Sequence, residues 1–158
     1  MFRELIRKNK QLPEQEVIEI LKEEKRGVLS VLGDDGYPYG TPMNHWYNEE
    51  DGKIYFPCGR VGHRLDALRR CEKVSYCVMD KGRPSEIEWA QEIRSVIVFG
   101  RMEIVEDREK MTEMVTKLCY KFTEDEAYIR KEIEQSGPAT LLLCLTPDHI
   151  CGKKVTEA

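Results

Sequence analysis

The stretch from Cys58 to Arg64 has the composition of an anion-binding loop. It reads CGRVGHR and connects an apolar segment, expected as a strand, to an expected helix. Glycines let backbone amides approach an anion, and a helix N-terminus adds free N–H groups with a positive partial charge. His63 and Arg64 add side-chain donors, and arginine offers a forked, permanently charged group. Gly62, His63 and Arg64 are therefore candidates for holding a phosphate. The alternative is an ordinary loop with two exposed basic residues.

A second stretch, YPYGTPMNHW over residues 37–46, has the features of a ligand-binding strand. Its two prolines cannot donate to a sheet ladder, so the stretch is expected at a sheet edge or against a ligand. Polar groups on Thr41 and Asn44, beside aromatic and thioether side chains, suit a flat heteroaromatic ring with polar edges. A proline-bent strand whose polar face is satisfied within the chain remains an equally good interpretation.

Other familiar chemistry is missing from the sequence. There is no G-x-S-x-G, H-E-x-x-H, P-loop or G-x-G-x-x-G motif. The six cysteines form no C-x-x-C pair and have no histidine at metal-ligand spacing. We therefore expect reduced structural cysteines and no metal site, and the sequence assigns no catalytic residue.

The elements that must position these stretches are mostly strands. The pattern predicts helices over 14–25, 63–70, 108–120 and 123–135, and strands over 27–32, 37–47, 53–58, 73–80, 93–107, 139–146 and 149–155. Gly100 marks a bend or bulge in the long strand, and the pattern leaves 81–92 as a loop. Short turns between consecutive strands favour antiparallel pairing, and a closed or partly open barrel would remove sheet edges.

Length and composition limit the class of protein. A chain of 158 residues suits one domain, here 1–158 with an N-terminal helical segment over 1–26. The net charge is −4 and basic residues are interleaved with acidic ones, which argues against nucleic acid as a partner. No apolar run reaches the ~20 residues of a membrane span. The first residues lack the apolar core of a signal peptide, so we expect a cytoplasmic protein.

The sequence contains the motif D-G-Y-P-Y-x-x-P over residues 35–42 and the motif G-H-[RK]-x-D-A over residues 62–67. Together, and at this separation, they resemble the motifs of the pyridoxamine 5′-phosphate oxidase-like FMN-binding split barrels. Within that superfamily the chain is most similar to the nitroimidazole-resistance (Nim-type) flavin-nucleotide-binding branch, from about Gly27 to the final ICGKK. The resemblance implies a mainly β fold, a six-stranded antiparallel Greek-key split barrel with flanking helices. It also implies a homodimer with FMN in two grooves at the subunit interface.

The resemblance carries specific expectations for the site. His63 and Arg64 would hold the FMN phosphate. The residues expected along the isoalloxazine or elsewhere in the site are Thr41, Pro42, Met43, Asn44, Ser95, Val96 and Lys153. One position departs from the pattern, because Pro57 stands where Nim-type sequences carry a histidine near the flavin. A proton donor for substrate reduction would then come from His45, Tyr39 or water.

The implied function is that of an FMN-dependent oxidoreductase. Electrons would pass from NADH or NADPH through FMN to a small organic acceptor such as a nitroaromatic compound, with chemistry of the nitroreductase or pyridoxamine 5′-phosphate oxidase type. No nicotinamide-binding fingerprint is present, so the nucleotide would visit transiently and stack on the flavin. Two alternatives stay open: a flavin-binding carrier, store or sensor without turnover, and a split barrel that uses haem or a deazaflavin.

Overall fold

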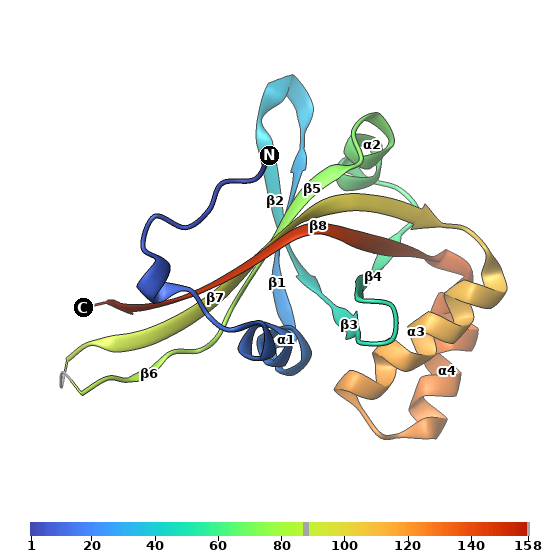
Figure 1. Cartoon of the computed structure of the whole chain (residues 1–158). Coiled ribbons are helices and arrows are strands. Elements are labelled where there is room, and N and C mark those ends of the chain that lie inside the picture. The colour runs from blue at the N-terminus through green and yellow to red at the C-terminus, as the bar shows by residue number, and fades with distance from the viewer. Residues whose placement is uncertain (87–88, 158) are drawn as a thin grey trace.

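A computed structural model describes residues 1–86 and 89–157, which form one curled antiparallel sheet with helices against it (Figure 1). The strands are β1 (Arg26–Leu32), β2 (Pro38–Asn44), β3 (Trp46–Asn48), β4 (Lys53–Gly59), β5 (Lys73–Met79), β6 (Arg83–Pro84), β7 (Gln91–Val105) and β8 (Thr140–Glu157). The α-helices are α1 (Glu14–Glu23), α2 (His63–Arg70), α3 (Arg108–Phe122) and α4 (Glu126–Ser136). The strand order is β2-β1-β5-β7-β8-β4-β3, and β6 pairs with β7.

This architecture confirms the mainly β split-barrel fold with flanking helices. The expected number of six strands is wrong, because the described residues form eight. The segment 37–47 breaks into β2 and β3 at His45, whose backbone N–H donates to the Lys25 carbonyl instead of a neighbouring strand. The stretch 81–92 contributes the short β6, while residues 87–88 lie outside the described part. No helix in the described part is both long and apolar enough to span a membrane.

The pair β7–β8 is the longest in the sheet, and β8 corrects a second expectation. Residues 139–146 and 149–155 are predicted as two strands, but they belong to the single strand β8. The register shifts between Phe99 and Gly100, so Asp148 has no opposite residue in β7, and the chain passes Pro147 without ending the strand. Gly100 lies at this bulge as predicted. A Cβ there would collide with the Thr146 carbonyl and come within 2.8 Å of Leu145 Cδ1.

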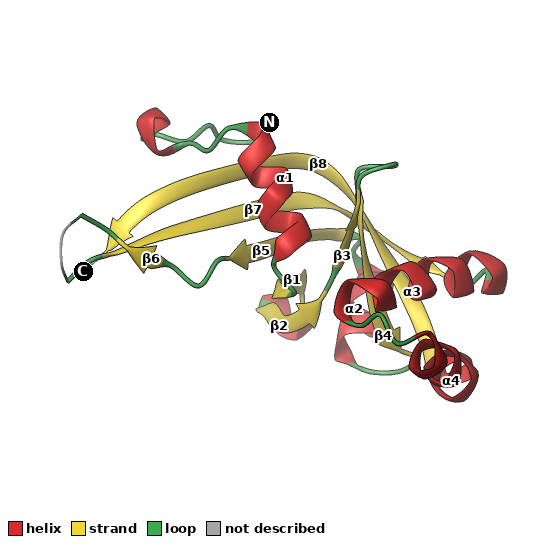
Figure 2. Cartoon of the chain, turned by 90° about the horizontal axis from the view of Figure 1, so that it is seen from below, coloured by secondary structure: helices red, strands yellow, loops and turns green. Residues whose placement is uncertain are grey.

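Helices close the sheet in two places. The N-terminal helix α1 buries Val17, Ile20 and Leu21 in the main core, on the inner face of the curl. Helices α3 and α4 lie together at the other end (Figure 2), where α3 joins a second apolar cluster of Tyr55, Val105, Met111, Leu142 and Cys144, and α4 packs on α3. Each of these two helices begins at an aspartate whose side chain accepts a backbone N–H, Asp107 for α3 and Asp125 for α4.

A buried polar cluster around His45 joins these parts. The fully buried His45 ring lies between the Leu21 carbonyl, 2.7 Å from Nε2, and the Tyr76 hydroxyl, 2.7 Å from Nδ1. A carbonyl only accepts, so Nε2 carries the proton and Nδ1 accepts from Tyr76. The ammonium of Lys121 donates to the carbonyls of Glu24 and His45. Four segments, α1, the β2–β3 corner, β5 and α3, are thereby tied together.

Acid should weaken this cluster. Burial, and then the charge of Lys121, lowers the pKa of His45 from 6.5 to about 3. Between these two values only the unfolded chain takes up the proton, so the stability that His45 contributes above pH 6.5 is lost as the pH falls toward 3. The free energy of unfolding should drop by up to ~1.4 kcal/mol per pH unit through this group alone. Urea unfolding between pH 4 and 7 measures that slope.

The matched variants are His45→Gln, which should lose this part of the slope, and His149→Gln, which should keep it because His149 lies outside the cluster. An unchanged slope in His45→Gln would show that the carboxylates alone set the acid sensitivity.

Candidate functional site

The side chain of Arg64 lies where α2, β2 and β4 come together. Gly62 precedes the helix with φ at 134°, a conformation that suits glycine, and α2 buries Leu65 and Leu68 on its inner face. Arg64 Nη1 donates to Thr41 Oγ1 at 3.1 Å, and Nη2 donates to Cys58 Sγ at 3.5 Å. The loop, the edge strand β2 and the neighbouring strand β4 thus converge on one guanidinium.

The Nε–H of Arg64 is buried and has no hydrogen-bond partner in the described part of the chain. Nor does any carboxylate among residues 1–86 and 89–157 form an ion pair with Arg64. A buried, permanently charged donor without a partner costs free energy, which an anion would offset. The donor set of guanidinium, hydroxyl and thiol therefore fits a phosphate and offers a metal ion no carboxylate or imidazole.

His63 is next to Arg64 in the sequence but is committed to the β1–β2 hairpin. Its Nε2 accepts the Asp34 backbone N–H at 3.2 Å, and its ring stacks on Tyr39 with centroids 4.1 Å apart. Asp34 is also held by Arg70 at 2.7 Å. A neutral ring that accepts at Nε2 carries its proton on Nδ1, so Nδ1–H is the nitrogen left for a ligand.

The four predicted residues of β2 divide between its two faces. Thr41 points to Arg64 and Met43 is buried in the core, while Pro42 and Asn44 are exposed on the opposite face. β2 is an edge strand of the sheet. Proline has no N–H, so it fits at a strand position whose N–H would point away from the neighbouring strand. N–H groups two residues apart point the same way, so those of Gly40 and Asn44, on either side of Pro42, point to the free edge of the sheet.

Pro42 also borders a groove of about 700 Å³ on the outer face of the sheet. Its apolar floor includes Val28, Cys77 and Met79, and three cations stand on its walls: Lys25, Arg26 and Lys81. Two glutamates from the end of α1, Glu23 and Glu24, complete the lining. The groove is large enough for part of a nucleotide cofactor and mixes apolar and cationic surface.

The three predicted residues on later strands are separated from Arg64. Ser95 pairs with Met79 on one side and Lys153 on the other, which places all three on the outer face of the sheet. Burial raises the pKa of the Cys77 thiol, and the nearby charge of Lys153 opposes that rise. Val96 alternates to the inner face, where its side chain is completely buried in the core. Ser95 and Lys153 thus share a face with the groove, and the Val96 side chain does not.

The two side chains expected as proton donors, His45 and Tyr39, lie in different parts of the structure. Both ring nitrogens of His45 are engaged inside the protein, so it is not placed to protonate a ligand. Tyr39 lies against His63, near the phosphate candidates. Pro57 faces a cavity beside α3 and α4, whereas its neighbour Cys58 faces Arg64. Cys58 begins the predicted anion-binding stretch, but its thiol was not a candidate contact; only the alternation of side chains along β4 could have suggested that role.

Comparison with known proteins identifies the family. The family model described as pyridoxamine 5′-phosphate oxidase matches residues 13–154, and the chain belongs to this family. There is no match among curated proteins.

Several solved structures share the fold. The putative 5-nitroimidazole antibiotic resistance protein of Bacteroides thetaiotaomicron has a TM-score of 0.78 at 18% identity, over 93% of this chain and 87% of that one. The conserved hypothetical protein Rv2991 of Mycobacterium tuberculosis has a TM-score of 0.76 at 22% identity, over 93% and 88%. An FAD-binding protein of Mesorhizobium loti has a TM-score of 0.64 at 19% identity, over 92% and 96%.

Proposed function

We propose that this protein binds FMN, with the phosphate at Arg64. The observation that carries the proposal is the half-buried guanidinium between Thr41 and Cys58, whose buried Nε–H has no partner among the described residues. The first backbone N–H groups of α2 have no partner within the helix and add donors beside it. Membership of the pyridoxamine 5′-phosphate oxidase family, and the flavin bound by solved relatives such as the Mesorhizobium loti protein, support a flavin as the ligand.

The ring system of the flavin would lie along the edge of β2. The free N–H groups at Gly40 and Asn44 would serve its polar edge, and Pro42 would contact its face. When bound, the flavin supplies the redox chemistry by accepting and passing on electrons. The chain's own residues anchor the phosphate, orient the ring and leave the outer groove beside Pro42 for a second molecule.

Arg64→Ala should separate phosphate recognition from recognition of the ring. A charge-assisted hydrogen bond contributes ~1.5–3 kcal/mol, so FMN affinity should fall about ten- to a hundredfold. Riboflavin lacks the phosphate, so its weaker binding should hardly change. Arg69→Ala is the matched control, because Arg69 lies on the same helix, is exposed and pairs only with Asp66 among the described residues. Fluorescence titration of both flavins on the native protein and the two variants measures the six dissociation constants. Equal losses for FMN and riboflavin would remove Arg64 from the phosphate site.

The reaction we propose is transfer of electrons from NADH or NADPH through FMN to a small organic acceptor, including nitroaromatic compounds. The mixed apolar and cationic groove beside Pro42 suits a transient anionic nucleotide. A second candidate function, flavin binding without turnover, is favoured by one observation. Pro57 stands where Nim-type sequences carry a histidine, and His45 is sealed in the core, so only Tyr39 and water remain of the expected proton donors.

Spectroscopy and turnover distinguish these functions. The purified protein should show the absorbance of oxidised flavin, while a haem or deazaflavin spectrum would contradict the FMN assignment. Anaerobic addition of NADH or NADPH should bleach that absorbance, and a nitroaromatic acceptor should restore it over many cycles. Reduction without repeated cycles, for nitroaromatic and pyridoxamine 5′-phosphate substrates alike, would favour the carrier or sensor function.

The free cysteines suit a reducing compartment such as the cytoplasm, which we retain as the proposed location.

A homodimer is part of the proposal. Val28, Leu32, Met79 and Phe99 are large apolar side chains exposed on the outer face of the sheet, each at least 39% accessible. Strand register places them on one surface together with Ser95 and Lys153. A second copy packed there by two-fold symmetry would make the groove beside Pro42, whose floor includes Val28 and Met79, a site lined by both chains, and would bring residues of two chains to each flavin.

Met79→Glu should break that association, because a charge would be buried in the interface. Light scattering should give twice the chain mass for the native protein and the single mass for Met79→Glu, together with weaker flavin binding. Tyr128→Glu, at an exposed aromatic residue on α4, should stay dimeric. A native monomer that retains its flavin would contradict the dimeric site.

A further inference from the structure

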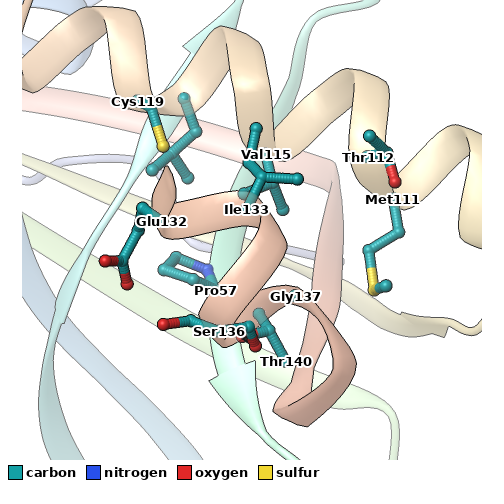
Figure 3. Close-up of a pocket in the computed structure, with 11 residues that line it drawn as sticks. Pro57, Met111, Thr112, Val115, Cys119, Glu132, Ile133, Ser136, Gly137 and Thr140 are labelled. Atoms are coloured by element: carbon teal, nitrogen blue, oxygen red, sulfur yellow. Dashed lines mark hydrogen bonds between the residues drawn. The ribbon is translucent and has the colours of Figure 1, made fainter. Parts of the chain in front are cut away.

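A second cavity lies between α3, α4 and β4 (Figure 3). Its volume is about 190 Å³. The apolar part of its wall consists of Pro57, Met111, Val115, Leu118 and Ile133. Pro57 and Cys58 alternate along β4, so this cavity is on the opposite side of the strand from Arg64. It is therefore separate from the proposed flavin site.

Among the described residues that line the cavity, Glu132 carries the one carboxylate, at one end of the lining. In Figure 3 the Glu132 carboxylate lies on the same side as Cys119 and Pro57. Burial raises the pKa of the Cys119 thiol, and the negative charge of Glu132 raises it further. The Thr140 hydroxyl is already used, since it donates to the Ser136 carbonyl at 2.7 Å. The carboxylate is thus the charged group that the lining offers to a ligand.

Glu132 forms no ion pair with the rest of the described chain, residues 1–86 and 89–157. It differs in this from Glu113 on α3, which pairs with Lys117 at 3.0 Å. A half-buried carboxylate at the end of an apolar chamber attracts a cation more strongly than one in open water. Charge complementarity therefore selects a positively charged group at this end and rejects an anionic one.

We infer that this cavity binds a small organic amine, with a single apolar ring between α3 and α4 and its ammonium group on Glu132. Size supports this class of ligand, because an apolar protein cavity of ~150 Å³ is known to hold one benzene ring. A cavity of about 190 Å³ adds room for a short arm that carries the amine. Nucleotides and flavins need pockets of ~300 Å³ or more and are excluded by size.

Benzylamine, benzyl alcohol and benzoate are suitable probes, since they share one ring and differ in charge. Titration of the ¹⁵N-labelled full-length protein should shift the amides of Cys119, Ile133 and Thr140 with benzylamine. Benzyl alcohol should bind at least tenfold more weakly, and benzoate should give no shift at these amides. Equal binding of the three probes, or shifts confined to other amides, would overturn the inference.

The Glu132→Gln variant removes the charge and keeps the shape of the side chain. It should weaken benzylamine about tenfold or more and leave benzyl alcohol unchanged. Glu134→Gln is the matched control on the same helix, because Glu134 is exposed and lies outside this cavity. Unchanged benzylamine affinity in Glu132→Gln, or an equal loss in Glu134→Gln, would overturn the inference. Flavin content plays no part in these measurements, so they are independent of the proposed function.

Discussion

The pairing of β7 with β8 is the constraint on which the rest of the molecule depends. The middle of β7 pairs with β5, which continues to β1 and β2, while the first part of β8 pairs with β4, which continues to β3. Among the described residues, the two halves of the sheet are therefore joined by strand pairing only through β7 and β8. The bulge at Phe99–Gly100 changes the direction of these strands. The resulting curl brings β2 and β4 near one another, and Arg64 spans them by donating to Thr41 and Cys58. A flat sheet would leave these partners far apart.

Local signals in the sequence predicted local structure well. The residues 63–70 form a helix as predicted, because a flexible glycine precedes them and leucines recur on one face. The prediction of a bend or bulge at Gly100 is confirmed, because a glycine inside a strand often marks a bulge or a close approach of another backbone. Pro147 misled the prediction, since a proline commonly ends a strand. Here the extra residue Asp148 in β8 lets the strand continue beyond it.

The candidate site was only partly visible in the sequence, for a physical reason. Gly62, His63 and Arg64 are contiguous, so their composition alone indicated an anion. Their partners Thr41 and Cys58 come from strands that meet through the curl of the sheet, and no short-range pattern encodes that meeting. The roles of neighbouring residues also depend on that packing. His63 gives one nitrogen to the Asp34 backbone, which its position beside Arg64 does not reveal.

His45 and Arg64 both have buried nitrogen atoms, but only those of His45 are all satisfied by the protein. His45 has both nitrogens satisfied by the protein, and burial keeps its ring neutral, so it stabilises the fold and has nothing left to offer a ligand. Arg64 stays charged at any relevant pH, and its Nε–H lacks a partner in the described chain. Neutralising such a group within the protein would need a carboxylate, which would repel a phosphate. Under the proposed function, the unsatisfied donor is the free-energy cost that would keep this position selective for an anion.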